Sequence, residues 1–441
     1  MDKNEILRKL QSKKPLFEQV PRTSWKAIGG TESEYGSFTK DVDRSRLPVF
    51  TTNGGLVYID CDHLEYASPE TSNALEALMY YEAGKVLCWQ ENFTRPLYCH
   101  NTDWEGNTFG AHESYFTNAP RYRWEKLLPF LIARVIICGN GWFNKEGKFV
   151  ISQRAQYIER ASSEETKLRR GVINLRHEPL GKAGDYDERL HLICRDANMS
   201  EVSTFLCVGI TALILELLEK NALPEVSYDS DKSATDILQI SKRTSGWFLV
   251  GIKGSERGAV ELLSCYLERA KSIFSKRDSV TDALLIIWED TLEKLARNPM
   301  ELSERLDWVA KLKLLNLFQE NVGDECTANW LCSQDMEYHN LDPEKGLYYW
   351  LRDNFQMERI ISDEMILYAT EEPPKDTRAY VRGKLAQHLL ERGGECLLGV
   401  NSWDNLNVYS KSGGIARKSY PIPDPFNNYG YLLGTLKRQY S

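Results

Sequence analysis

Residues 57–70 read VYIDCDHLEYASPE, and this stretch predicts a β-strand whose two faces differ. Successive side chains of a strand point to opposite faces of a sheet, so Tyr58, Asp60 and Asp62 share one face while apolar residues alternate with them. Glu65 follows just beyond. An aspartate on an otherwise apolar strand is costly to bury without a partner. This face therefore either meets water at a sheet edge or lines a site, and the pattern alone leaves both open.

A second acidic strand precedes it, in the segment GGTESEYG at residues 29–36. Glu32 and Glu34 are two residues apart, so they project from the same face of the strand. Two neighbouring carboxylates repel each other unless a cation lies between them, and a magnesium ion with oxygen ligands is the natural one. The ordinary alternative is a solvated strand face with two exposed glutamates, and spacing alone favours that alternative.

The surrounding sequence predicts strands first and helices next. Between Gly29 and about Arg195, strand-like runs alternate with glycine-containing turns, and one helix starts near Ser72. The predicted strands are 56–60, 96–103, 133–141, 148–155, 171–176 and 189–196. After Asn198 the amphipathic or apolar segments 205–218, 281–298 and 303–318 predict helices. This order indicates an α+β fold.

Three regions are expected along the 441 residues. Residues 1–27 form an N-terminal extension, in which ILRKLQ fits a short amphipathic turn and Pro15 and Pro21 prevent a long helix. A disordered tail is the expected state, and a partner-docking arm is the alternative. Residues 28–372 form one large domain. The pair Pro373-Pro374 marks a boundary, so residues 373–441 form a small C-terminal domain.

The overall composition excludes some classes of protein. The net charge of −8 provides no basic footprint for nucleic acid. The apolar run at 205–218 is too short to span a bilayer and contains a glutamate, so no membrane segment is expected. The ten cysteines form no CxxC pair, and the charged N-terminus has no apolar core of a secretory signal. We therefore expect buried, reduced thiols and a cytoplasmic location.

Two further segments carry polar groups at structurally useful places. The loop HNTDWEGNTFGAHESYF at 100–116 follows a predicted strand, and a polar loop there is either a site or an ordinary hairpin connection. In RDANMSEVSTFL at 195–206, Asn198 and Ser200 lie at the start of an apolar helix. The free N–H groups there favour an anion such as a phosphate, while simple helix capping also explains Ser200.

Taken together and in order, these segments resemble the Pup ligase and depupylase family, which is related to glutamine synthetase and carboxylate-amine ligases. The resemblance covers about residues 29–383, with a weaker similarity to the end. The segments that carry it are GTESEYG, VYIDCDHLEYASPE, NTDWEGNTFGAHESYF, ISQRAQYIE, VINLRHEPL, RLHLICRDANMSEVSTFL, LDWVAKLKLL, PEKGLYYWL and PPKDTRAYVRG.

The resemblance implies a curved antiparallel β-sheet cradle that packs on helices, holds ATP and Mg²⁺ on its concave face and is completed by a small C-terminal domain. It implies as partners Pup or a Pup-like small protein modifier and its conjugates, in a proteasome pathway. The ligase joins the C-terminal glutamate of Pup to a substrate lysine. The depupylase hydrolyses that isopeptide bond or deamidates a C-terminal glutamine of Pup, with nucleotide as a cofactor.

By residue, the resemblance implies that Asp60 is the catalytic carboxylate. It implies metal ligands or metal-site residues at Glu32, Glu34, Tyr58, Glu65 and His191. It also implies ATP contacts at Ser68, Arg378 and Trp403, and the helix start at Asn198 and Ser200 is expected to join them. No GxxxxGK[ST] loop occurs, so the nucleotide is not held by a P-loop.

The segments DCDHLEY, ASPE, DANMSE and EPPKDTRAYVRG look closer to depupylase than to ligase, so a depupylase-like hydrolase is expected. Three features depart from the family pattern: only 17 residues separate Gly36 from Gly54, Leu56 replaces a usual arginine, and HLEY replaces HPEY. A ligase that forms the isopeptide through a glutamyl phosphate, a non-catalytic nucleotide-binding regulator and a small-molecule glutamate–amine ligase are the alternatives.

Overall fold

The computed structural model describes residues 2–36, 49–60, 63–91, 96–144, 146–253, 258–322, 327–354, 356–393, 395–410 and 418–440. Cys61, Asp62 and residues 37–48 of the short segment after the first strand lie outside this range. The expectations for Asp62 and for most of the segment 37–53 therefore fall outside the described residues.

Within the described residues, eleven strands form one sheet in the order β13-β12-β11-β2-β3-β4-β1-β5-β10-β9-β8. The strands are β1 (Gly29–Tyr35), β2 (Val49–Phe50), β3 (Leu56–Asp60), β4 (His63–Ala67), β5 (Ala111–Thr117), β8 (Ile158–Ser163), β9 (Arg170–Asn174), β10 (Glu188–Leu192), β11 (Cys396–Gly399), β12 (Asn405–Ser410) and β13 (Lys418–Pro421). All neighbours are antiparallel except β8 and β9, which pair in parallel. The expected α+β class is confirmed, with one parallel pair at an edge of the sheet.

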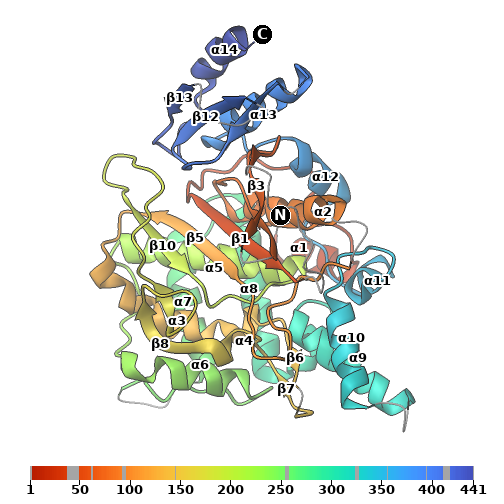
Figure 1. Cartoon of the computed structure of the whole chain (residues 1–441). Coiled ribbons are helices and arrows are strands. Elements are labelled where there is room, and N and C mark those ends of the chain that lie inside the picture. The colour runs from red at the N-terminus through yellow and green to blue at the C-terminus, as the bar shows by residue number, and fades with distance from the viewer. Residues whose placement is uncertain are drawn as a thin grey trace.

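Helices pack on one face of this sheet and around it (Figure 1). They are α1 (Lys3–Gln11), α2 (Ala74–Glu91), α3 (Leu128–Ala133), α4 (Val135–Cys138), α5 (Glu201–Glu219), α6 (Ser233–Ser241), α7 (Ala259–Phe274), α8 (Ser279–Arg297), α9 (Asp307–Val322), α10 (Ala328–Tyr338), α11 (Leu347–Asp353), α12 (Asp363–Glu371), α13 (Ala379–Glu391) and α14 (Gly430–Gln439). Helix α2 contacts β1 and β4, and α5 contacts β5. Gly84 of α2 lies against the ring of Tyr66, where a Cβ would clash, so glycine permits this close approach.

The sheet has a packed face and an open face. On β1, Thr31, Ser33 and Tyr35 are buried, while Glu32 and Glu34 between them are only partly buried. On β10, Leu190 and Leu192 are fully buried among the helices. The acidic residues of β1 therefore point away from the helices, as the two-residue spacing predicts.

Helix α5 explains the longest apolar run of the sequence. It is the one helix among the described residues that is long and apolar enough to cross a membrane, and 94% of its apolar window lies inside the fold. Ser200 caps its N-terminus by accepting a hydrogen bond from the N–H of Ser203. The run at 205–218 is therefore a core helix, as predicted.

Two predicted strands were wrong. Residues 133–141 contain the short helix α4, whose four residues are all buried, because a continuous apolar run satisfies a buried helix as well as a buried strand. Residues 96–103 form only isolated bridges, such as Tyr98 with Gly36. The predicted strand at 148–155 shrinks to β7 (Phe149–Val150), which pairs with β6 (Trp142–Phe143).

The expected disordered tail at residues 1–27 is also wrong. Helix α1 occupies Lys3–Gln11, and Ile6 and Leu10 are fully buried in the main hydrophobic core. Trp25 is buried as well, with the guanidinium of Arg277 stacked 4.7 Å from its ring centroid. Apolar residues at helical spacing in ILRKL give this short helix a face that it buries against α8.

The anchoring of α1 can be measured with one substitution. Leu10→Ala is expected to lower the free energy of unfolding by about 2–5 kcal/mol, because it leaves a cavity at a fully buried position. Leu168→Ala, at an exposed leucine, serves as the control and should change it by no more than about 0.5 kcal/mol. Equal effects of the two substitutions in urea unfolding would contradict the docking of α1.

The C-terminal strands continue the main sheet rather than forming a separate one. Gly399 of β11 pairs with Val49 of β2. Leu56 and Phe50 share a hydrophobic cluster with α13, β11 and β12. Figure 1 shows α13, β12, β13 and α14 gathered at one end of the molecule. The division of the chain at residue 373 stays a prediction.

Candidate functional site

The open face of the sheet brings the predicted acidic residues of three strands together. Glu34 of β1 lies opposite Glu65 of β4 in the strand register, and Tyr58 of β3 lies opposite the same Glu65 from the other side. Asp60 ends β3 and pairs with His63. The sequence placed these residues on one face of each strand, and antiparallel pairing then aligns the faces in one row.

The carboxylates in this row are close enough to share a cation. Ligand oxygens of Glu34, Asp60 and Glu65 all lie within 4.8 Å of one another. The Tyr58 hydroxyl donates a 2.5 Å hydrogen bond to Oε1 of Glu32, which lies two residues before Glu34 on β1. This bond connects Glu32 to the row. Burial and the charges of Glu32 and Glu65 raise the pKa of Tyr58 above its usual value, so this hydroxyl keeps its proton.

The electrostatics of the row call for positive charge. Burial, together with the nearby Glu32 and Glu34, raises the pKa of the Glu65 carboxyl well above its usual value. Crowded carboxylates cannot all ionise unless a cation offsets their repulsion. Oxygen ligands from several carboxylates are the set that Mg²⁺ prefers, so these residues fit a magnesium ion.

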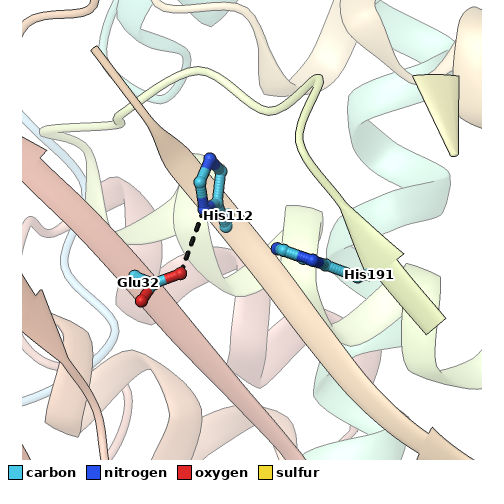
Figure 2. Close-up of side chains that lie close together, drawn as sticks. All are labelled: Glu32, His112 and His191. Carbon is cyan, nitrogen blue, oxygen red and sulfur yellow. Dashed lines mark hydrogen bonds and ion pairs between the residues drawn. The ribbon is translucent and has the colours of Figure 1, made fainter. Parts of the chain in front are cut away.

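A second group of metal-ligating side chains adjoins the first. Figure 2 shows Glu32 from β1, His112 from β5 and His191 from β10, which come from three neighbouring strands. Nδ1 of His112 lies 3.0 Å from Oε2 of Glu32, and the two imidazole rings are 5.2 Å apart at their centroids. Burial and then the neighbouring His112 lower the pKa of His191, so its ring is neutral and able to ligate a metal ion.

A cavity of about 100 Å³ opens beside Glu32. The N-terminal half of β1 forms its floor, and three predicted ATP contacts line it, namely Ser68, Arg378 and Trp403. The structure therefore brings these three residues next to Glu32, one of the predicted metal ligands. The cavity also exposes the ring of Phe116, which offers an apolar surface for a base, while Arg378 and Arg189 offer positive charge for phosphates.

Hydrogen bonds fix two of these lining residues. The hydroxyl of Ser68 accepts a 2.9 Å bond from the N–H of Thr31 and lies 3.1 Å from the carbonyl of Pro69, to which it donates. Nε of Arg378 donates a 2.7 Å bond to Oε1 of Glu70. Both side chains are buried, so their positions are set before any ligand binds.

Asn198 and Ser200 lie elsewhere, and their predicted role in ATP binding is not supported. Both are fully buried, and neither lines the cavity. Nδ2 of Asn198 donates a 3.0 Å bond to Asp307, and the N–H of Ser200 donates a 2.9 Å bond to the same carboxylate. The polar groups at the start of α5 therefore already have a hydrogen-bond acceptor, which is the side chain of Asp307. The helix-capping interpretation of Ser200 accounts for what is observed.

The capping role of Ser200 has a measurable consequence. Ser200→Ala is expected to lower the free energy of unfolding by about 0.5–2 kcal/mol, because it removes the cap of α5. The affinity for MgADP should stay unchanged, as measured by calorimetry on the folded protein. A loss of nucleotide affinity without loss of stability would return Ser200 to the nucleotide site.

Two residues of the site were missed by the sequence analysis. His112 was quoted within the loop 100–116, but only the register of β5 against β1 places it opposite Glu32. Arg189 lines the cavity, and its Nε lacks a hydrogen-bond partner in the described part of the chain. The signal for Arg189 was present, since it precedes His191 by two residues and therefore shares its face of the strand.

Leu56 lies in the hydrophobic cluster of Phe50, Val381 and neighbouring residues. The position where the family pattern has an arginine is therefore apolar here. Cations reach the cavity from other elements, as Arg189 and Arg378 do.

Comparison with known proteins identifies the family. A family model described as Pup-ligase protein matches residues 10–407. A depupylase from Acidothermus cellulolyticus is 33% identical over 90% of this chain and 82% of its own length. A Pup deamidase/depupylase from Mycolicibacterium smegmatis is 34% identical over 88% and 80%, respectively. A Pup–protein ligase from Kineococcus radiotolerans is 31% identical over 86% and 87%.

Solved structures agree with the sequence comparison. The Pup ligase PafA in complex with the prokaryotic ubiquitin-like protein Pup matches with a TM-score of 0.82 and 27% identity, over 94% of this chain and 92% of that one. PafA in complex with ADP matches with a TM-score of 0.79 and 28% identity, over 89% and 90%. A match of this length in both sequence and fold, around a clustered acidic site, places the chain in the Pup ligase and depupylase family of enzymes.

Proposed function

We propose that this protein is an ATP- and Mg²⁺-dependent amidohydrolase of the depupylase type. It cleaves the isopeptide bond, or deamidates a C-terminal glutamine, at the terminal glutamate side chain of Pup or a Pup-like modifier. The observation that carries the proposal is the row formed by Glu34, Asp60 and Glu65. Glu32, on the same face of β1 as Glu34, lines the adjoining cavity. An acidic row next to a cavity lined by arginines suits chemistry on a carboxylate with a nucleotide nearby.

The proposed roles follow from position. Glu32, Glu34, Glu65 and His191 hold the metal, with Tyr58 oriented on Glu32. Ser68, Arg378 and Trp403 hold the nucleotide. When bound, Mg²⁺ supplies positive charge that polarises the amide carbonyl and offsets phosphate charge. A relative solved with ADP supports a nucleotide in this cavity.

Asp60 performs the hydrolytic step. It is exposed at the end of β3, where a substrate can reach it, and it lies against Glu34 and Glu65. As a base, its carboxylate takes a proton from the attacking water, and the C–N bond of the isopeptide then breaks. The lysine amine leaves with that proton, and Pup leaves with a free glutamate. As a nucleophile, the Asp60 carboxylate would instead attack the amide carbonyl, and the C–N bond would break as the lysine amine leaves with a proton from solvent. Water would then open the resulting anhydride, which returns Asp60 and releases Pup with a free glutamate.

The ligase direction is the second candidate. The same aspartate can deprotonate an attacking lysine after ATP phosphorylates the glutamate of Pup, because phosphorylation gives the carboxylate a leaving group. The four Pup–protein ligases compared with this chain match at 29–31% identity, and the four depupylases compared with it match at 33–34%. This difference, together with the motif DCDHLEY, favours hydrolysis.

A non-catalytic regulator is less well supported. A module that only binds nucleotide has no need for a carboxylate such as Asp60, and placing this third carboxylate within 4.8 Å of those of Glu34 and Glu65 costs repulsion unless a cation offsets it. The partner we propose is Pup or a Pup-like protein and its conjugates, since a related ligase was solved in complex with Pup. A cytoplasmic location stays a prediction.

One reaction series tests the proposal. The purified protein with ATP and Mg²⁺ receives a Pup–protein conjugate, Pup ending in glutamine, or Pup ending in glutamate with a lysine-bearing acceptor. Release of Pup from the conjugate, or deamidation, without net conjugation is the expected result. Conjugate formation with release of ADP would make the protein a ligase. Bound nucleotide with none of the three reactions would contradict chemistry on Pup.

A further inference from the structure

The nucleotide cavity is built from two parts of the chain that are far apart in sequence. Gly29–Glu32 of β1 and Ser68 are among the residues that line it. Arg378, Trp403 and Pro425, which belong to residues 373–441, line it as well. The shape of the cavity therefore depends on how these two parts are held together.

The carboxylate of Glu70 connects these two parts of the chain. Its Oε1 accepts a 2.7 Å hydrogen bond from Nε of Arg378 and a 3.3 Å bond from Nη1 of Arg382. Its Oε2 accepts a bond from Nη2 of Arg382. Burial alone would raise the pKa of Glu70, but the two guanidinium groups more than offset this and lower it to about 2. Glu70 is therefore ionised and engaged on both oxygens.

Arg382 does more than neutralise Glu70. It is fully buried and does not line the cavity. Its guanidinium carbon lies 4.7 Å from the ring centroids of both Phe50 and Trp403, and its Nε donates a 2.8 Å bond to the carbonyl of Gly54. Burial lowers the pKa of Arg382, but an arginine remains charged at neutral pH.

This geometry links one buried cation to two walls of the cavity. Arg382 fixes the indole of Trp403 by stacking, and it fixes Arg378 through the shared carboxylate of Glu70. A planar, five-donor guanidinium can satisfy both contacts at once, whereas an ammonium or an apolar side chain cannot.

We propose that Arg382 is a positioning residue for the nucleotide: it sets nucleotide affinity by holding Trp403 and Arg378 in place without touching the ligand. The proposal rests on the proposed nucleotide site. It assigns a function to the second arginine of TRAYVRG, which contacts Phe50 of β2, Glu70 after β4 and Trp403.

A purely structural role is the alternative, and the chain offers a matched control for it. Arg305 is equally buried, and its guanidinium donates a 2.6 Å bond to Glu358 and a 2.7 Å bond to Asp290. It does not line the nucleotide cavity. Loss of either buried ion pair should destabilise the fold, but only Arg382 is linked to the walls of the cavity.

The test measures MgADP affinity by calorimetry and thermal stability in parallel, for the wild type, Arg382→Met, Arg382→Lys and Arg305→Met. Arg382→Met is expected to bind MgADP at least about tenfold more weakly than the wild type. Arg382→Lys keeps the positive charge but loses the planar, forked arrangement of donors, so its affinity for MgADP should lie between those of the wild type and Arg382→Met. This variant also provides the test if Arg382→Met does not fold. Arg305→Met should lose stability and keep wild-type affinity.

In turnover assays, the nucleotide concentration for half-maximal rate should rise in the Arg382 variants, while the rate at saturating nucleotide changes by no more than about twofold. The inference is overturned if the Arg382 variants bind MgADP like the wild type, or if Arg305→Met loses as much affinity at equal loss of stability. A wild type that binds no nucleotide would instead refute the proposed nucleotide site, and this inference with it.

Discussion

Asp60→Asn is expected to lower the turnover of a Pup conjugate by about 10²- to 10⁴-fold, the range that a general base contributes. The amide is nearly the same size as the carboxylate but cannot accept a proton or act as a nucleophile. Because Asp60 is exposed at the end of β3, the substitution should leave the unfolding temperature within about 2 °C.

The measurement is single-turnover cleavage at saturating Mg²⁺ and nucleotide, so that any change in metal affinity does not enter the rate. Asp231→Asn, at an exposed aspartate before α6, is the matched control and should cleave like the wild type. If Asp60→Asn keeps more than about a tenth of the wild-type rate, the catalytic role of Asp60 is wrong.

Glu32→Gln is expected to have the second largest effect, because Glu32 belongs to the group with His112 and His191, accepts a hydrogen bond from Tyr58 beside the acidic row and lines the cavity. Its two oxygens contact Tyr58 at 2.5 Å and His112 at 3.0 Å. The neutral amide removes the charge at the centre of the site, so the gain in nucleotide affinity that Mg²⁺ provides should fall at least about tenfold.

Calorimetry with ADP, with and without Mg²⁺, isolates this gain. Glu225→Gln, at an exposed glutamate after α5, should retain the full effect of Mg²⁺. An unchanged effect of Mg²⁺ in Glu32→Gln would remove Glu32 from the metal site. Weaker binding of ADP alone, with the Mg²⁺ effect preserved, would limit Glu32 to shaping the cavity.

The acidic row could be predicted because strand alternation is a local property. Glu32 and Glu34 on β1, and Tyr58 and Asp60 on β3, share faces by spacing alone, and antiparallel neighbours put those faces together. His112 could not be assigned in the same way. Its place opposite Glu32 depends on the register between β5 and β1, which local spacing does not specify.

Sequence-based predictions fail where one sequence pattern fits two different structures. A continuous apolar run such as 133–141 has no period that separates strand from helix, and burial among α3 and α5 favours the helix. The start of α5 fits an anion or a cap equally well. What decides between them is Asp307, which lies 107 residues after Ser200 and cannot be placed there from the sequence.

The central claim is that the open face of the sheet holds divalent metal beside a nucleotide, and crystals grown with ADP and Mn²⁺ test it most directly. We predict anomalous density at a carboxylate distance of about 2.0–2.3 Å from Glu32, Glu34 or Glu65, and ADP in the cavity lined by Ser68, Arg378 and Trp403. Anomalous density or nucleotide confined to other parts of the molecule would contradict the account.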